Sequence, residues 1–337
     1  MKADLSKKVD FDGMRRIGVA EDGGTGDALE SVAPAGTEWQ EVDIGLEGAT
    51  PRKVRVLVSK PETFAGRQGY DPTFIDGWEI PLPQPADAHD LRQLRRGGQG
   101  HVLTYEHFST VQSTSRRMPM FVAVNINGNR AKKITRTSTP WRFDGRLDVE
   151  DQIGDEVYSE KKNVLDRGHM VRREDPIWGT PTVAGRANVD TFHFTNSCPQ
   201  MAQVNQQTWL GLENYILHNT RDEDLSVSVF TGPVFGKRDL RYRGALIPKS
   251  FFKVVAIVDA DGRPSATAYE VSQEDELSEL EFVFGPYKTF QTSLAAIEEK
   301  TGLAFGDLKE HDGFSVSEKK GRPRKRVALE SLEMVRI

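Results

Sequence analysis

Thiols, long apolar runs and a secretory leader are all scarce or missing in this chain. Cys198 is the only cysteine, so no disulfide can form within the chain. No stretch reaches the roughly 18 apolar residues needed to cross a bilayer. The N-terminal sequence MKADLSKK lacks the apolar core of a signal peptide. We therefore expect a cytoplasmic protein without disulfides or membrane-spanning segments.

Several common catalytic signatures are missing as well. The histidines show no HExxH spacing, and a single cysteine gives no structural zinc site. No GxSxG nucleophile elbow occurs. Residues 232–237 resemble a phosphate-binding loop only superficially, because the glycines are too close and no Ser or Thr follows the lysine. We interpret that stretch as a turn at the end of a strand.

The net charge of -5 argues against a protein that binds polyanions over its whole surface. The basic residues are nevertheless clumped, which permits a local basic cleft. Each clump alone is best explained as a solvated surface, but several clumps beside one site predict a phosphate-binding surface. The clumps lie at residues 92–96, 116–117, 130–136, 142–146, 161–173, 237–243 and 319–326.

The first part of the chain differs in composition from the rest. Residues 1–37 are polar and glycine-containing, and residues 38–59 hold two alternating stretches that predict a strand pair across the turn at 45–48. We expect an N-terminal extension over residues 1–65 and a main domain over residues 66–337. The extension is either an inhibitory or partner-docking segment, or a tail followed by an edge hairpin.

The main domain is predicted to be α+β, with a mainly antiparallel central sheet flanked by helices. Apolar, β-branched runs predict strands at residues 121–126, 227–231, 251–258 and 267–271. Helical spacing predicts helices at residues 199–219, with Pro199 in the first turn, and at residues 294–300.

The most informative motif is Asp166-Arg167-Gly168-His169. An imidazole can take a proton from water near neutral pH. A guanidinium beside it can hold a phosphate oxygen. Alone, such a histidine is more often structural than catalytic, so the motif needs support from elsewhere in the chain.

That support comes from the predicted helix at residues 199–219. Asn205, Trp209 and Glu213 recur every four residues and so lie along one side of it. An amide oxygen and a carboxylate there can hold a hydrated Mg²⁺, which needs few protein ligands. Taken alone, this pair is better explained as exposed polar residues of a helix.

Three segments in order change this balance: residues 166–169 (DRGH), 194–200 (FTNSCPQ) and 205–213 (NQQTWLGLE). Together they resemble the DNA/RNA non-specific endonucleases, the ββα-metal or His-Me finger nucleases that include endonuclease G-like enzymes. The resemblance covers about residues 66–337, and it implies a ββα-metal motif at the site. Further similar stretches lie at residues 103–109, 125–128, 141–146 and 230–235.

The resemblance implies roles for individual residues. His169 takes the place of the general base, and Asn205 that of the direct Mg²⁺ ligand, with Mn²⁺ as a substitute. Glu213 takes the place of the acidic residue that positions metal-bound water. Arg167 corresponds to an arginine that holds the site and the phosphate, and Asn196 to an amide that supports the histidine or phosphate region.

One family feature is displaced. The family has a second, phosphate-clamping arginine upstream, but Thr139 occupies the aligned position here. We choose Arg136 for that role, with Arg142 and Arg146 as rivals. Four other residues are assigned to structure: Asp166, Gly168, His193 and Cys198.

The resemblance therefore implies a Mg²⁺-dependent endonuclease that hydrolyses DNA, RNA or both to 5′-phosphate and 3′-hydroxyl ends. Phosphate contacts carry little sequence information, so weak sequence preference follows. The alternative is a catalytically silent nucleic-acid-binding or scaffold protein with the same fold. A homodimer, and a regulatory partner bound through residues 1–65, are further expectations.

Overall fold

The computed structural model describes residues 33–44, 52–158, 165–201, 213, 216–218, 220–221, 224–258, 262–273, 288–313 and 327–328. Within it, Pro34–Ile337 forms one compact unit. In the described part of the chain, the helices are too short or too polar to cross a membrane.

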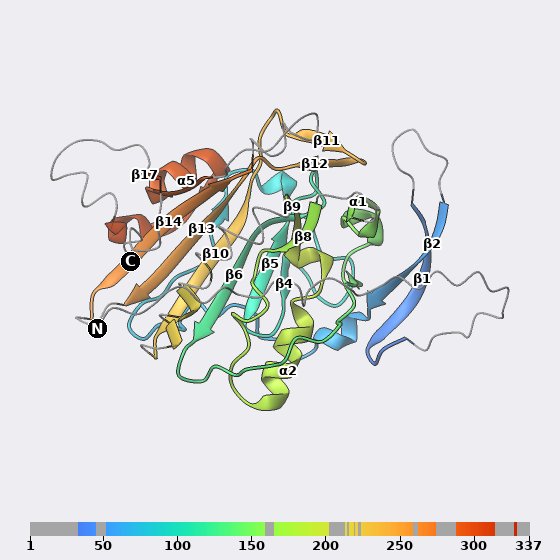
Figure 1. Ribbon diagram of the computed structural model, residues 1–337, viewed down its shortest axis with the longest axis horizontal. Coiled ribbons are helices and arrows are strands. Elements are labelled where there is room, and N and C mark those ends of the chain that lie inside the picture. The colour runs from blue at the N-terminus through green and yellow to red at the C-terminus, as the bar shows by residue number, and fades with distance from the viewer. Residues whose placement is uncertain are drawn as a thin grey trace, which may run out of the picture. The chain divides into compact units, whose positions relative to one another are not determined.

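An eight-stranded sheet forms the centre of this unit (Figure 1). Its order is β17-β15-β14-β13-β10-β6-β5-β4, and each neighbouring pair is antiparallel. This confirms the predicted α+β class with a mainly antiparallel sheet. The strands are β4 (Val102–Thr104), β5 (Phe108–Gln112), β6 (Pro119–Asn127), β10 (Ser226–Val234), β13 (Ser250–Val258), β14 (Pro264–Ser272), β15 (Lys288–Thr292) and β17 (Val327–Ala328).

Both faces of the sheet are covered, because successive side chains of a strand point to opposite faces. In β13, Phe252 and Val254 belong to one core cluster, together with Leu294 and Ile297 of helix α5 (Leu294–Thr301). Phe251 and Val255 belong to the other cluster, which includes apolar residues of the site-bearing segments. Each fully buried side chain of this size contributes about 1.5–3 kcal/mol relative to an exposed one.

The predicted N-terminal strand pair is present and is joined to this body. Strands β1 (Thr37–Ile44) and β2 (Arg52–Ser59) are antiparallel, as predicted. Strand β2 also pairs in parallel with β7 (Phe143–Asp144), and the Ser59 hydroxyl lies 2.8 Å from Nε2 of the buried His193. The hairpin thus shares hydrogen bonds with a loop that backs the candidate site.

Short elements complete the described fold. They are η2 (Pro61–Phe64), β3 (Gln84–Pro85), η3 (Ala88–Asp90), η4 (Val149–Asp151), α1 (Asp155–Tyr158), β8 (Leu165–His169), α2 (Pro181–Asp190), η5 (Phe194–Asn196), β9 (Ser197–Met201), β11 (Leu240–Tyr242), β12 (Ala245–Ile247), β16 (Leu303–Ala304) and η7 (Gly306–His311).

The predicted strands in the main sheet are confirmed, and so is the helix at residues 294–300. Ser293 caps α5 by accepting from the Ala296 amide, and Gly302 ends it with a left-handed φ of 68°. The placement of Pro199 in a first helical turn is wrong. Pro199 lies in β9, opposite Arg167 of β8, because pairing with the strand that carries the DRGH motif overrides the local preference of proline.

Helix α2 has no counterpart among the sequence predictions. Its start does carry a local signal: Thr180 accepts a hydrogen bond from the Val183 amide, and Pro181 occupies the first turn. A threonine before a proline, followed by an alanine-containing stretch, could have identified it.

Candidate active site

The DRGH motif forms strand β8 of a two-stranded hairpin with β9. The register places His169 opposite Ser197 and Gly168 opposite Cys198. Because side chains alternate along a strand, Arg167 and His169 share one face of β8, and Asp166 and Gly168 share the other. The two residues expected to act on the phosphate and on the proton, Arg167 and His169, therefore lie on one face of β8, opposite to the two residues assigned to structure.

Gly168 is required by close packing. A Cβ atom built on Gly168 would lie 2.0 Å from Oε1 and 2.2 Å from Cδ of Gln200, a fully buried side chain of β9. No other residue type leaves that space free. The expected structural role of Gly168 has this contact as its physical basis.

His169 lies in an aromatic corner. Its ring centroid is 4.7 Å from that of Trp141 and 5.2 Å from that of Phe192, the latter in an edge-to-face arrangement. The Nε2 atom is buried and has no hydrogen-bond partner among the described residues. An orphaned ring nitrogen of this kind points to a ligand or reactant, since buried polar atoms are otherwise paired.

Burial, with a smaller contribution from the charges of Arg136 and Arg173, lowers the pKa of His169 to about 3. The imidazole is therefore neutral at pH 7 and has a nitrogen lone pair available for a proton. A phosphate bound between these cations would raise the pKa, because its negative charge favours the imidazolium form.

Two arginines thus supply the positive charge beside His169. Arg136, which the sequence singled out, is exposed and acts on both His169 and Arg173. Arg173 was not among the predicted site residues. Its guanidinium donates to the Ile134 carbonyl and to Asn188 Oδ1, both at 3.1 Å, and it pairs with Glu174 at 2.8 Å.

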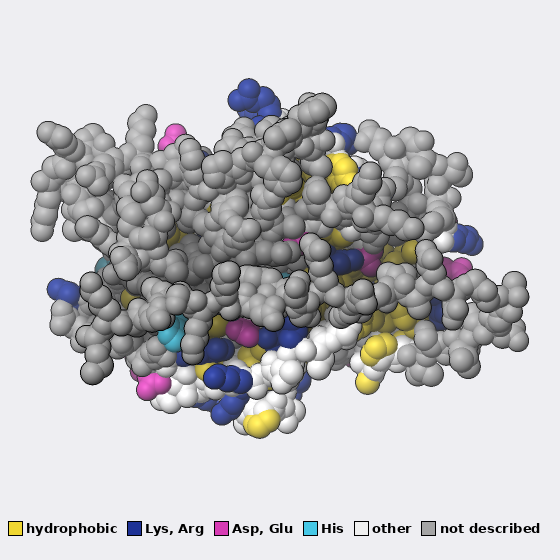
Figure 2. All heavy atoms as spheres, in the orientation of Figure 1, with side chains coloured by type: hydrophobic (Ala, Val, Ile, Leu, Met, Phe, Trp, Pro, Cys, Tyr) yellow, Lys and Arg dark blue, Asp and Glu magenta, His cyan; other side chains and the backbone are white. Residues whose placement is uncertain are grey.

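The loop after β6 adds further basic side chains. Figure 2 shows Lys and Arg gathered in the lower part of the view, where Figure 1 draws this loop and α2. Arg130, Lys132 and Lys133 of the loop are exposed. The Lys132 amide donates to the Ile177 carbonyl at 2.9 Å, so the loop runs beside the segment that carries Arg173.

Arg167 has a different setting from His169. Its Nε donates to Oδ1 of Asp155 in α1 at 2.9 Å, and its guanidinium lies 5.3 Å from the Tyr158 ring. Two charged partners at a partly exposed position contribute at most about 1 kcal/mol of stability. In the described structure, Arg167 therefore joins the DRGH strand to α1.

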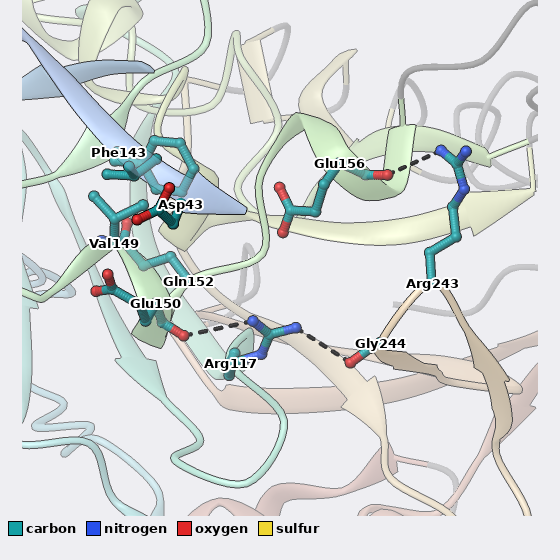
Figure 3. A pocket seen from close by; sticks show the side chains of 10 residues that line it. Asp43, Arg117, Phe143, Val149, Glu150, Gln152, Glu156, Arg243 and Gly244 are labelled. Atoms are coloured by element: carbon teal, nitrogen blue, oxygen red, sulfur yellow. Dashed lines mark hydrogen bonds between the residues drawn. The ribbon is translucent and has the colours of Figure 1, made fainter. Parts of the chain in front are cut away.

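Helix α1 also lines a hollow of about 190 Å³ (Figure 3). The side chain of Glu156 reaches into it, and burial raises the pKa of that carboxyl. Arg243 donates to the Glu156 carbonyl at 2.9 Å, and Arg117 donates to the carbonyls of Gly244 and Glu150. These bonds connect α1, and through it Arg167, to the β11–β12 turn.

Arg142 and Arg146, the rivals for the phosphate role, are both buried. Arg142 donates to the Pro140 carbonyl at 3.3 Å. Arg146 forms a two-pronged ion pair with Asp144, with a shortest distance of 2.7 Å, and this pairing raises the pKa of Arg146. Neither guanidinium is presented to a substrate in this structure.

Asn196 is fully buried and holds the chain just after His169. Its Oδ1 accepts from the Val171 amide at 2.8 Å, while Nδ2 donates to the carbonyls of Val171 at 3.0 Å and Thr191 at 3.1 Å. The Asn196 carbonyl also accepts from the Met170 amide. The Asn196 amide is thus fully engaged with backbone groups of the chain that follows β8.

Glu213 lies in a buried charged cluster that also holds Asp175 and Lys253. The Lys253 ammonium lies 3.4 Å from Glu213 Oε1 and donates to Thr231 Oγ1 at 3.0 Å. Burial raises the pKa of Asp175 to about 7, opposed by Lys253 and Arg172 and assisted by Glu213. The charge of Arg172 acts on both Arg173 and Asp175, which links the cluster electrostatically to Arg173.

The remaining predicted residues divide clearly. Asn205 falls outside the described residues. His193 is buried, with Nε2 on Ser59 and Nδ1 2.8 Å from the Asp190 carbonyl, which supports a structural role. Cys198 is fully buried, and burial raises the pKa of its thiol, so it is not an available nucleophile.

Within the described ranges, no group of three or more His, Cys, Asp or Glu side chains gathers as a metal site. The described site residues comprise the neutral His169 imidazole with its unpartnered Nε2, the Arg136 and Arg173 charges that act on it, and the buried Glu213, Asp175 and Lys253 cluster. Arginine side chains near a neutral imidazole favour an anionic ligand that contains phosphate.

Comparison with known proteins agrees with this class. A family model described as DNA/RNA non-specific endonuclease matches residues 89–312, which is more than half of the 337 residues. The chain therefore belongs to the DNA/RNA non-specific endonuclease family.

Individual relatives extend the comparison. The uncharacterized protein y4fB of Sinorhizobium fredii (strain NBRC 101917 / NGR234) is 38% identical over 335 residues, covering 90% of this chain and 50% of the relative. Human mitochondrial endonuclease G is 30% identical over 153 residues, covering 42% of this chain and 48% of the relative. A nuclease of Nostoc sp. (strain PCC 7120 / SAG 25.82 / UTEX 2576) is 26% identical, covering 42% and 50%. The chain thus spans about half the length of these curated relatives.

The fold also has a match among solved structures. The crystal structure of the EndoG/EndoGI complex contains a chain that superposes with a TM-score of 0.50 and 20% identity. The superposition covers 63% of this chain and 87% of that chain. At this identity the match shows the fold alone, which is that of a His-Me finger nuclease.

Proposed function

We propose that the protein is a divalent-metal-dependent endonuclease that hydrolyses phosphodiester bonds of DNA, RNA or both with little sequence preference. The observation that carries the proposal is the buried, unpaired Nε2 of His169, on which the positive charges of Arg136 and Arg173 act. Membership of the endonuclease family supports it.

His169 acts as the general base in this proposal. Its neutral imidazole accepts a proton from the water that attacks phosphorus, and Trp141 and Phe192 fix the plane of the ring. Attack displaces the 3′ oxygen, so the products carry 5′-phosphate and 3′-hydroxyl ends.

The arginines bind the substrate and stabilise the charge that develops on it. The charges of Arg136 and Arg173 both act on His169. In this proposal the two guanidinium groups bind non-bridging phosphate oxygens. Arg167 keeps β8 fixed to α1 through Asp155. Asn196 fixes the backbone that follows His169, which makes it a positioning residue.

The donor types that the family resemblance implies, an amide and a carboxylate, suit a hard divalent cation such as Mg²⁺, with Mn²⁺ as a substitute. Carboxylate and amide oxygens are the ligands that Mg²⁺ prefers, and it retains most of its waters. Asn205 would hold it directly, as the family resemblance implies, and the buried Glu213 carboxylate would hold it through water. When bound, the cation supplies positive charge to the phosphate and to the leaving oxygen.

Substrate recognition in this proposal rests on phosphate. The exposed Arg130, Lys132 and Lys133 lie in the same loop as Arg136 and add positive charge to it. Contacts of this type position nucleic acid without reading its bases, and their affinity falls as salt rises.

We also propose that the protein acts in the cytoplasm. The regulatory partner expected to bind residues 1–65 stays a prediction.

The test is cleavage of plasmid DNA and of structured RNA with Mg²⁺ or Mn²⁺, with EDTA as the metal-free condition. Wild type is expected to digest at least one of the two substrates, and only with metal. His169→Ala is expected to lose at least about a hundredfold in rate, the usual contribution of a general base. His89→Ala, which removes an exposed histidine of η3, is the matched control.

Equal digestion by wild type and His169→Ala would remove His169 from the reaction. Salt-dependent nucleic-acid binding with no turnover under any divalent metal would instead identify the catalytically silent alternative.

A further inference from the structure

Lys253 is an unusual residue for its position. It is the only charged residue in β13, whose sequence is SFFKVVAIV, and it is 1% exposed near the middle of the central sheet. Burying an ammonium group costs several kcal/mol unless it is paired. An apolar side chain would fill the same space without that cost. We therefore ask which groups pair with the buried ammonium of Lys253.

The direction of the side chain gives the first part of that explanation. Lys253 is the cross-strand partner of Thr231 in β10, and its ammonium donates to the Thr231 hydroxyl at 3.0 Å. Its face of β13 is that of Phe251 and Val255, which pack in the same core cluster as Ile216. Lys253 therefore points to the side of the sheet where Glu213 lies.

The second part is the contact with Glu213. The ammonium lies 3.4 Å from Glu213 Oε1, and Glu213 is only 9% exposed. Because Thr231 and Glu213 share one ammonium, the carboxylate is held toward the sheet and its charge is partly balanced. Asp175 is also buried, which raises its pKa, and the positive charge of Lys253 acts to lower it. Lys253 therefore acts on two carboxyl groups, those of Glu213 and Asp175.

This arrangement bears on how a cation would be held. A carboxylate without a counter-charge readily replaces a water of a divalent cation, because the attraction between opposite charges is large at low dielectric. A carboxylate whose oxygen is engaged by an ammonium is a weaker competitor for that position. Mg²⁺ sites of nucleic-acid enzymes keep several waters.

We propose that Lys253 is a positioning residue that restrains Glu213, so that Glu213 acts on the site's divalent cation through water and not as a direct ligand. This inference deepens the proposed function and rests on it. It makes a prediction opposite to that of a purely structural ion pair: loss of Lys253 tightens metal binding while it slows turnover.

The experiment measures metal binding apart from activity. Full-length wild type, Lys253→Met, Lys253→Gln and Lys253→Arg are titrated with Mn²⁺ without nucleic acid, and free Mn²⁺ is followed by electron paramagnetic resonance. Line broadening in ¹⁷O-labelled water then counts the waters on the bound ion. Lys300→Met is the matched control, since it removes a lysine paired with Glu270 from the opposite face of the sheet.

Lys253→Met and Lys253→Gln are expected to bind Mn²⁺ roughly tenfold more tightly, the effect of removing one nearby positive charge. The bound ion should lose one water, and plasmid cleavage at saturating metal should fall at least about tenfold. Lys253→Arg should keep the wild-type water count, and Lys300→Met should match wild type in every measurement.

Weaker or unchanged Mn²⁺ binding in folded Lys253→Met and Lys253→Gln, with the wild-type water count, would overturn the proposal. If these variants fail to fold, Glu213→Gln decides the matter. The proposal requires an unchanged water count there, and one additional water would show that Glu213 was a direct ligand.

The two hypotheses fail in distinguishable ways. A wild type that cleaves with Mg²⁺ while the Lys253 variants bind metal normally contradicts only the role of Lys253. A wild type that binds Mn²⁺ but cleaves no nucleic acid contradicts the proposed function, and the water counts still test the restraint on Glu213.

Discussion

Gly168→Ala is the sharpest test of how the DRGH strand is packed. The added Cβ would meet three atoms of one side chain, Gln200: Oε1 at 2.0 Å, Cδ at 2.2 Å and Cγ at 2.5 Å. Gln200 is fully buried, so it cannot turn out into solvent. Gly168 is not in the left-handed region, so the cost comes from this contact and not from backbone strain.

The magnitude follows from two opposing effects. Overpacking a buried site costs about 1–3 kcal/mol. Replacing glycine with alanine also restricts the unfolded chain, which stabilises the protein by about 0.4–1 kcal/mol. The net expectation is a loss of about 1–2 kcal/mol in the free energy of unfolding, together with a loss of cleavage activity because the adjacent His169 shifts with the strand.

The assay is urea unfolding followed by circular dichroism on a double-mutant cycle. Gln200→Ala removes all three clashing atoms, so Gly168→Ala should cost much less in that background, with a coupling energy of about 1 kcal/mol or more. Unchanged stability of Gly168→Ala, or equal cost in both backgrounds, would show that the contact does not determine the glycine.

Three further predictions concern charge and burial. Arg136→Ala should raise the pKa of His169, because it removes a positive charge that lowers it; NMR titration of the imidazole checks this, and an unmoved pKa would place Arg136 elsewhere. The pKa of Asp175 in the folded protein is about 7, above its ordinary value of 3.8, so the folded state holds this proton more tightly than the unfolded state does. The stability that the protonated carboxyl contributes is therefore complete below about pH 3.8 and is lost as the pH rises to about 7. In urea unfolding, the stability of Asp175→Asn relative to metal-free wild type should therefore rise between about pH 4 and pH 7, and a constant difference would refute the shift. Ser59→Ala should cost about 1–3 kcal/mol in the same assay by leaving His193 Nε2 unpaired, and a neutral effect would show that the hairpin is not anchored there.

The sequence predicted individual strands well because their signal is local. The apolar, β-branched run in β13 and the turn before β14 specify a strand and a hairpin without reference to the rest of the chain. The order of the sheet is different, since β6 and β10 pair across about a hundred residues of intervening chain, a separation that no local pattern encodes. Nor does periodicity show that the DRGH segment would pair with residues 197–201.

The failure at Pro199 has the same origin. Proline suits the first turn of a helix, and the apolar spacing downstream favoured that interpretation. In the structure, Pro199 lies opposite Arg167, and its carbonyl accepts from Gln273 at 3.3 Å. Long-range pairing with β8 outweighs a local preference that is worth only fractions of a kcal/mol per residue.

Arg173 and Lys253 were not singled out from the sequence, and the reasons are opposite. Arg173 was hidden in a run of charges, where one arginine cannot be told from another without its contacts. Lys253 was hidden in an apolar run that already predicted a strand. A lone lysine in such a run was a usable signal, because a buried ammonium needs a partner and so predicts an acidic residue on a facing element.

In the proposed site, Arg136 and Arg173 make the pKa of His169 depend on whether phosphate is bound. Arg136 and Arg173 add to the effect of burial and hold the pKa of His169 near 3, where imidazole is a weak base. A phosphate that binds these guanidinium groups brings negative charge beside the ring, which raises the pKa and strengthens the base. His169 would thus become an effective proton acceptor only when a phosphodiester is in place. The groups that recognise the phosphate and the group that activates water are coupled through charge, so losing either arginine should affect both binding and turnover.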